Sequence, residues 1–205
     1  HTRLRCDWSS DVCASDLEFT AILAGNSLLT LAFEILSDSD LKIPKKIKAT
    51  LIRALSNCSG HSGLAGGQYL DLTFENKNIS KKNIINMQKK KTGELFGFCC
   101  ESIAVINEDN IKKRKLMKEI GLQIGLLFQI VDDLIDYKGD SATVGKPTKS
   151  DEKKGKATLV NLLGYSETLN FAKTIKKKLD QQIKKYGIKA NDLLESIEFI
   201  LTREF

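Results

Sequence analysis

Apolar residues recur at helical spacing along most of the chain from residue 18 onward, and no stretch shows the strict alternation of a strand. Residues 18–36 are apolar nearly all round, which predicts a helix buried on every side. The same spacing predicts further helices over residues 47–60, 81–107, 111–137, 157–164, 166–186 and 190–203. The pattern therefore favours an all-α fold.

Short polar segments separate these helices. Residues 37–40 (SDSD) end the first helix, and Pro44 suits the first turn of the next. Ser80 follows a turn and has the side chain of a good N-cap. The small residues of GLAGGQ (63–68) let a helix or a ligand approach closely. Residues 138–156 are polar and rich in glycine and lysine, so we expect a loop there.

Residues 1–17 depart from the helical pattern. They lack its apolar period, and they contain the single Trp and two of the five Cys. The string CDWSSDVCASDL resembles a translated sequencing-adapter peptide, so we interpret residues 1–17 as extraneous. The expected domain is then residues 18–205, and the alternative is that residues 1–17 form a genuine disordered arm.

The composition narrows the class of protein. A chain of 205 residues with 41% hydrophobic residues can bury one sizeable core. No apolar run reaches the ~18 residues that span a bilayer, and no secretory signal is evident. These features predict a cytoplasmic protein without stable membrane insertion.

The charge points away from nucleic acid. The net charge is +6, but 27 of the 32 basic residues are Lys, and few aromatics lie among them. Surfaces that bind nucleic acid favour Arg and aromatic side chains. We therefore interpret the lysine clusters as solvated helix faces. The cysteines show no metal-binding spacing.

The strongest chemical signal is the sequence FQIVDDLID at residues 128–136, near the end of a largely apolar helix. Asp132, Asp133 and Asp136 lie within about one helical turn of each other, with Gln129 one turn earlier. Clustered carboxylates suit Mg²⁺, which fills its remaining positions with water and phosphate oxygens. The alternative is a helix end whose acidic residues simply face water.

Basic residues near this motif suit a phosphate group. Lys91 and Thr92 can both donate to a diphosphate, although a surface position is the commoner explanation of any one such lysine. The predicted loop carries Lys146 and ends near Lys156. Such a loop can close over phosphates and exclude water.

Five blocks in order carry a family resemblance: ILAGNSLLTLAFEIL, GLAGGQYLDL, KKKTGELFGFCCESIAVI, GLQIGLLFQIVDDLIDYKGD and TVGKPTKSDEKKGKATLVNLLG. Together they resemble the trans-isoprenyl diphosphate synthases (polyprenyl synthetases), and most of all the bacterial farnesyl and geranylgeranyl diphosphate synthase branch. The resemblance implies an isoprenoid-synthase-type helical bundle, here truncated on its N-terminal side. It also implies Mg²⁺-dependent head-to-tail condensation of an allylic diphosphate with isopentenyl diphosphate, with farnesyl diphosphate as product.

The resemblance assigns roles to individual residues. Asp132, Asp133 and Asp136 match the second aspartate-rich motif and would hold Mg²⁺, with Asp132 as the direct ligand. Lys91, Asp132 and Lys146 would act in catalysis. Residues matched to substrate binding are Gln68 and Asp71, which would line the cavity, and Lys91, Thr92, Gln129, Lys146 and Lys156, which would bind the allylic diphosphate.

The departures from the family pattern matter as much as the matches. The family uses two facing aspartate-rich motifs, whereas this chain has one DDxxD sequence. We therefore expect the 205-residue chain to be inactive or nearly so, and its parent to be a homodimer. Two alternatives stay open: a non-catalytic helical subunit of a heteromeric synthase, and a terpene cyclase of the same fold.

Overall fold

The computed structural model describes the backbone of residues 11–138 and 155–203, and the side chains of those residues from Phe19 onward. Every regular element in the described ranges is helical, as the apolar spacing predicts. The chain divides into two compact units, His1–Ile52 and Arg53–Phe205.

The first unit contains α1 (Asp11–Ser37) and the first half of α2 (Lys45–Ser59). Helix α1 begins ahead of the predicted start at residue 18, within the segment interpreted as extraneous. The prediction that this helix is buried on every side is wrong, because Phe19, Leu23 and Leu28 are each more than 60% exposed. The helix has a buried helix's composition, but nothing described within its own unit covers it.

The expectation that no apolar run is long enough to span a bilayer also needs correction. Phe19–Ser37 is a 19-residue helical stretch with a mean hydropathy of 1.6, long and apolar enough to cross a bilayer by those criteria. Apolar core helices of soluble proteins meet the same criteria. The stretch is therefore weak evidence for a membrane span.

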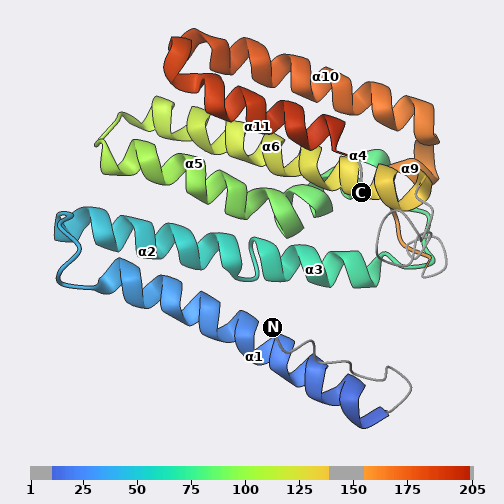
Figure 1. Cartoon of the computed structure of the whole chain (residues 1–205), viewed down its shortest axis with the longest axis horizontal. Helices are drawn as coiled ribbons and strands as arrows, with labels where there is room; N and C mark the ends of the chain where they lie inside the picture. Colours follow the sequence, from blue (N-terminus) through green and yellow to red (C-terminus); the bar gives the residue numbers. More distant parts are fainter. Residues whose placement is uncertain (1–10, 139–154, 204–205) are drawn as a thin grey trace, which may run out of the picture. The chain divides into compact units, whose positions relative to one another are not determined.

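The second unit is built around one long helix, α6 (Ile111–Lys138). In Figure 1, α6 runs between α5 (Glu94–Ile106) on one side and α10 (Tyr165–Ile183) with α11 (Asn191–Thr202) on the other. The shorter elements are α3 (Leu64–Thr73), α4 (Lys81–Gln88), the π-helical turn η1 (Lys89–Gly93), α9 (Leu159–Leu163) and the 3₁₀ segment η2 (Lys184–Ala190).

Side chains from α6 and the helices beside it form the core of this unit. Leu127 and Ile130 on α6 are fully buried, as are Leu159, Leu179 and Ile197 from the elements that pack near them. Burying a side chain of this size stabilises the fold by about 1.5–3 kcal/mol. The core thereby fixes the C-terminal half of α6, which carries the aspartate motif.

Local signals account for the helix boundaries. Ser80 caps α4 as predicted, because its Oγ accepts a hydrogen bond from the Asn83 backbone N–H at 3.4 Å. The single helix predicted over residues 81–107 is present, but the π-helical turn η1 interrupts it between α4 and α5. A π-helical turn accommodates an extra residue and is often found at functional sites.

Glycines let the neighbouring helices approach η1 very closely. A Cβ on Gly67 of α3 would lie 2.2 Å from the Lys91 backbone nitrogen. A Cβ on Gly125 of α6 would lie 2.6 Å from the Cα of Gly93. The close approach predicted for the GLAGGQ segment is therefore confirmed, and η1 is held between two glycine contacts.

Candidate functional site

A small cavity lies where α3, α4, η1 and α6 meet the segment before α9. Two lysines, two carboxylates and two amides supply most of its polar lining. The lining residues are Asp71, Met87, Gln88, Lys91, Gln129, Asp133, Lys156, Ala157 and Thr158. Five of these, Asp71, Lys91, Gln129, Asp133 and Lys156, are residues that the sequence singled out.

An ion pair positions Lys91 on one side of the cavity. The Lys91 Nζ lies 2.5 Å from the Asp71 Oδ2, and the side chain of Asp71 is only 9% exposed. Lys91 lies on η1 and Asp71 on α3, so the pair joins the two elements that Gly67 brings together. The charge of Lys91 is thus held at the cavity by a buried partner rather than left to solvent.

A chain of hydrogen bonds crosses the other side of the cavity. Thr92 Oγ1 donates to Gln129 Oε1 at 2.9 Å, and Gln129 Nε2 donates to Asp133 Oδ1 at 2.9 Å. Gln88 Nε2 donates to Asp133 Oδ2 at 2.7 Å. The aspartate motif on α6 is therefore connected directly to the lysine-bearing turn.

The three aspartates of the motif have different surroundings. Asp133 faces the cavity and is 5% exposed, and Asp136 is buried at 7%. The Asp132 side chain is 36% exposed and lies 3.1 Å from the Arg203 guanidinium. The expected gathering of all three carboxylates in one group is not seen: the part of the chain that the structure describes holds no metal-binding group of three or more acidic, His or Cys side chains.

The donor chemistry still suits a magnesium ion shared with a substrate. Mg²⁺ typically takes one or two protein carboxylates and completes its octahedron with waters and phosphate oxygens. Asp132 and Asp136 are spaced four residues apart on α6, and Asp133, next to Asp132, lines the cavity together with the two lysines. The residues therefore fit a shared ion better than an ion enclosed by protein ligands alone.

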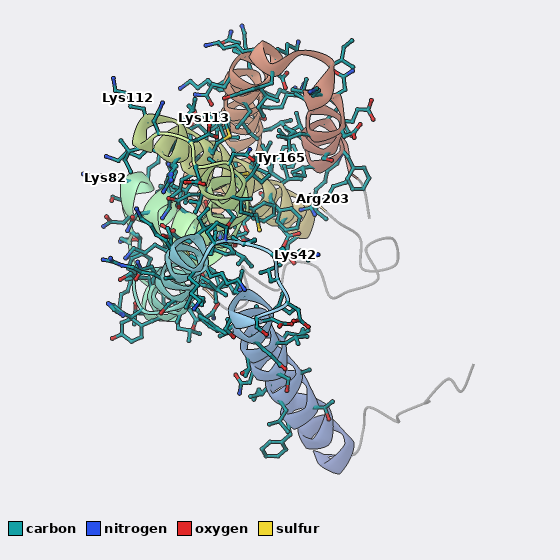
Figure 2. The ribbon with its side chains drawn as sticks, turned by 90° about the vertical axis from the view of Figure 1, so that its left-hand side faces the viewer. Lys42, Lys82, Lys112, Lys113, Tyr165 and Arg203 are labelled. Atoms are coloured by element: carbon teal, nitrogen blue, oxygen red, sulfur yellow. The ribbon has the colours of Figure 1, made fainter. Side chains whose placement is uncertain are left out.

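Arg203, just after α11, was not singled out from the sequence. Its guanidinium lies 4.0 Å from the centroid of the Phe128 ring and donates to the Phe128 carbonyl at 3.2 Å and to Asp132 Oδ1 at 3.1 Å. Burial lowers the pKa of Arg203, and the Asp132 charge opposes that shift. Figure 2 labels Arg203 at the end of the last helix. Arg203 lies 71 residues from Asp132 in the sequence. The one sequence feature that could have marked it as a site residue is that it is an Arg in a chain whose basic residues are mostly Lys.

Not every predicted site residue reaches this cavity. Gln68 is exposed on α3 and does not line it. Lys146 lies outside the described residues. Gln88 lines the cavity but was missed, although its place four residues after the buried Ile84 puts a polar group on an apolar helix face.

The lysine clusters divide into two kinds. Lys112 and Lys113 are exposed at the N-terminal end of α6, as labelled in Figure 2, in agreement with the predicted solvated face. Lys91 belongs to a cluster that we also interpreted as a solvated face, but it is partly buried and faces the cavity. For this cluster the solvated interpretation is wrong, because the π-helical turn lies against α3 and α6.

Comparison with known proteins places these features in a family. A model of the polyprenyl synthetase family matches residues 12–197. The farnesyl diphosphate synthase of Escherichia coli (strain K12) is 34% identical over 191 residues, which cover 91% of this chain and 64% of that protein.

Solved structures share the fold. An FPP/GFPP synthase from Zymomonas mobilis superposes with a TM-score of 0.75 at 34% identity, over 88% of this chain and 60% of that one. A geranyltransferase from Helicobacter pylori, solved with magnesium and isoprenyl diphosphate, gives a TM-score of 0.73 at 29% identity, over 90% and 60%. These likenesses confirm the predicted isoprenoid-synthase-type helical fold.

The chain spans about half the length of the first curated relatives that it matches, 53% and 50% of two bacterial farnesyl diphosphate synthases. The matched region begins inside the segment interpreted as extraneous, at residue 12. The likeness therefore concerns the described helices and the cavity among them.

Proposed function

We propose, from the premise that this chain belongs to the polyprenyl synthetase family, that its cavity binds the diphosphate of an allylic substrate. The family is one of short-chain prenyl diphosphate synthases, and the relatives are prenyltransferases. The whole protein would condense an allylic diphosphate with isopentenyl diphosphate, head to tail, and farnesyl diphosphate is the proposed product. The observation that carries the proposal is that Lys91 and Lys156 line one cavity with the Asp133 end of the aspartate motif.

The two lysines suit a departing diphosphate. Lys91 and Lys156 would balance the negative charge that develops on the leaving group, which is the term that usually dominates such catalysis. Thr92 remains a proposed diphosphate-binding residue, although its hydroxyl donates to Gln129 Oε1 and it does not line the cavity. Asp71 keeps Lys91 in place through the 2.5 Å ion pair. Departure of the diphosphate would leave an allylic carbocation, which the double bond of isopentenyl diphosphate would attack. The new cation would then lose a proton to the released diphosphate.

Asp132 and Asp136 would hold magnesium at the edge of this cavity, Asp132 as the direct ligand. When bound, Mg²⁺ supplies further neutralisation of the diphosphate charge. Lys146 remains a proposed diphosphate-binding residue of the segment before Lys156. Gln68 remains a proposed substrate-binding residue, although it does not line the cavity.

The test of this function compares two charge-matched variants. Lys91→Met removes an ammonium group from the cavity, and Lys112→Met removes one from the exposed end of α6. Calorimetric titration of inorganic diphosphate in Mg²⁺ should show at least about a tenfold weaker Kd for Lys91→Met, because one lost charge-assisted hydrogen bond is worth ~1.5–3 kcal/mol. Lys112→Met should stay within about twofold of the wild type. Equal losses in both variants would contradict the proposal.

For the 205-residue chain itself we propose little or no condensing activity. It contains one DDxxD motif, so one pair of magnesium-binding carboxylates would act on the diphosphate without a second pair opposite. The measurement is the formation of labelled prenyl diphosphate from geranyl diphosphate and isopentenyl diphosphate by the purified chain. Clear turnover would contradict this part of the proposal.

A second candidate function is a non-catalytic helical subunit of a heteromeric synthase. The observation that favours it is the engagement of Asp132 by Arg203, which competes with a metal for the same carboxylate oxygen. Co-purification with a complete synthase, together with no diphosphate binding by this chain, would support it over the first candidate.

Partners and place in the cell are also proposals. We propose a homodimeric parent protein in the cytoplasm, without nucleic acid and without membrane insertion, whose functional domain is residues 18–205. From residue 12 onward, helix α1 lies within the region matched by the family model, so its apolar side chains are proposed to be those of a bundle helix. A membrane-flotation assay that leaves the expressed chain in the soluble fraction would agree with this.

A further inference from the structure

Both carboxylate oxygens of Asp133 accept hydrogen bonds from side-chain amides. Gln88 Nε2 donates to Oδ2 at 2.7 Å, and Gln129 Nε2 donates to Oδ1 at 2.9 Å. Asp133 is only 5% exposed, and a buried carboxylate is costly unless it is hydrogen-bonded. These two amides provide that compensation, so the carboxylate is already held within the protein.

The same contacts fix the turn that carries Lys91. Gln88 is the residue immediately before η1, and Thr92 lies near its end. Thr92 reaches Asp133 through Gln129, since its Oγ1 donates to Gln129 Oε1 at 2.9 Å. One carboxylate on α6 therefore ties both ends of η1 to the long helix.

Asp132 differs from its neighbour Asp133 in its exposure and in its hydrogen-bond partner. Its side chain is 36% exposed, and its described partner is the guanidinium of Arg203 at 3.1 Å. Among the described residues, no side-chain amide donates to Asp132 as Gln88 and Gln129 donate to Asp133. The two adjacent aspartates of the motif thus face different surroundings on the same helix.

We infer that Asp133 and Gln88 are positioning residues that hold the Lys91–Thr92 turn at the diphosphate, and that Asp133 is not a magnesium ligand. This rests on the proposed function and reassigns one of the three aspartates predicted to hold the metal. A cation at Asp133 would have to enter a site that is only 5% exposed and share oxygens that already accept two short amide hydrogen bonds. Asp132 and Asp136 remain the residues for the metal.

The side-chain oxygen of Gln88 makes it possible to test the role of Asp133. Its Oε1 is buried and has no hydrogen-bond partner among the described residues. In an Asp133→Asn variant the new side-chain NH₂ would face the Gln88 NH₂, but a flip of the Gln88 amide would present Oε1 instead. The network would then keep the same number of hydrogen bonds, so Asp133→Asn should be tolerated. Asp133→Leu and Gln88→Met offer no such rearrangement.

The experiment measures Mn²⁺ binding by electron paramagnetic resonance in the presence of inorganic diphosphate. We expect Asp132→Asn to weaken Mn²⁺ binding at least about tenfold, and Asp133→Asn by less than about threefold. Asp133→Leu and Gln88→Met should instead weaken diphosphate binding by about tenfold. A loss of Mn²⁺ affinity in Asp133→Asn equal to that in Asp132→Asn would overturn the inference and leave the proposed function standing.

A second readout does not depend on ligand binding. Amide hydrogen exchange in peptides covering Lys89–Gly93 should match the wild type in Asp133→Asn and be at least about tenfold faster in Asp133→Leu and Gln88→Met, with peptides from α10 as the internal control. If the wild-type chain bound no diphosphate, the proposed function would fail, and this exchange would still decide whether Asp133 holds the turn. Fast exchange in Asp133→Asn, or unchanged exchange in Gln88→Met, would overturn the inference.

Discussion

Replacing Gly67 with alanine adds one methyl group where α3 meets the lysine-bearing turn. The new Cβ would lie 2.2 Å from the Lys91 nitrogen, 2.5 Å from the Lys91 Cα and 2.7 Å from the Lys90 carbonyl carbon. All three are backbone atoms, so no flexible side chain can move aside. The two elements must separate by roughly 1 Å before these contacts become ordinary.

Overpacking of this kind costs about 1–3 kcal/mol of stability. We expect the cost of Gly67→Ala to lie in the upper part of this range, because the new Cβ would meet backbone atoms that cannot move aside. For a chain of this size each kcal/mol lowers Tm by roughly 2–4 °C. We therefore expect Gly67→Ala to lower Tm by about 4–12 °C and to weaken diphosphate binding, because Lys91 moves with its backbone.

Gly25→Ala provides the matched control. Its Cβ would meet nothing within 4 Å on α1, and alanine favours a helix interior over glycine by ~0.5–1 kcal/mol. Differential scanning calorimetry of both variants makes the comparison. A Tm of Gly67→Ala at or above that of the wild type would refute the tight approach of α3 and η1.

Arg203→Ala should lower stability by about 2 kcal/mol, because it uncovers the Phe128 ring and leaves Asp132 without its guanidinium partner; urea unfolding measures this, and an unchanged midpoint would contradict it. Burial raises the pKa of the Cys58 thiol to about 11 from 9.0, so the unfolded chain releases this proton first. Stability should fall by on the order of 2 kcal/mol as pH rises from about 9 to about 11, and Cys58→Ala should remove that part of the slope. Lys156→Met should weaken diphosphate binding at least about tenfold by calorimetry. Removal of Mg²⁺ by a chelator should reduce that binding in the wild type as well, and insensitivity to the chelator would count against magnesium.

The helices themselves were predictable because the apolar period records which faces are buried. The sequence places the end of α6 correctly to within about a residue, and Ser80 marks the start of α4 by its side-chain chemistry. The exposure of the apolar side chains on α1 was not predictable from the sequence. Composition describes a helix's preference, whereas exposure depends on what packs against it.

The cavity was predictable in part. Family resemblance picked out Asp71, Lys91 and Lys156, and the structure brings all three to one place. The π-helical turn has no sequence signal that periodicity detects, because it adds a single residue to an otherwise continuous helix. Arg203 could not be paired with Asp132 from sequence, since that contact depends on how α11 packs against α6.

The most direct measurement is lysine footprinting with and without diphosphate and Mg²⁺. Each lysine is acetylated under limiting reagent, and its labelling rate is determined by mass spectrometry. Bound diphosphate should protect Lys91 and Lys156 by at least about fivefold, while the exposed Lys112 and Lys177 keep their rates. Equal labelling of all four lysines with and without diphosphate would contradict the claim that this cavity binds the substrate's leaving group.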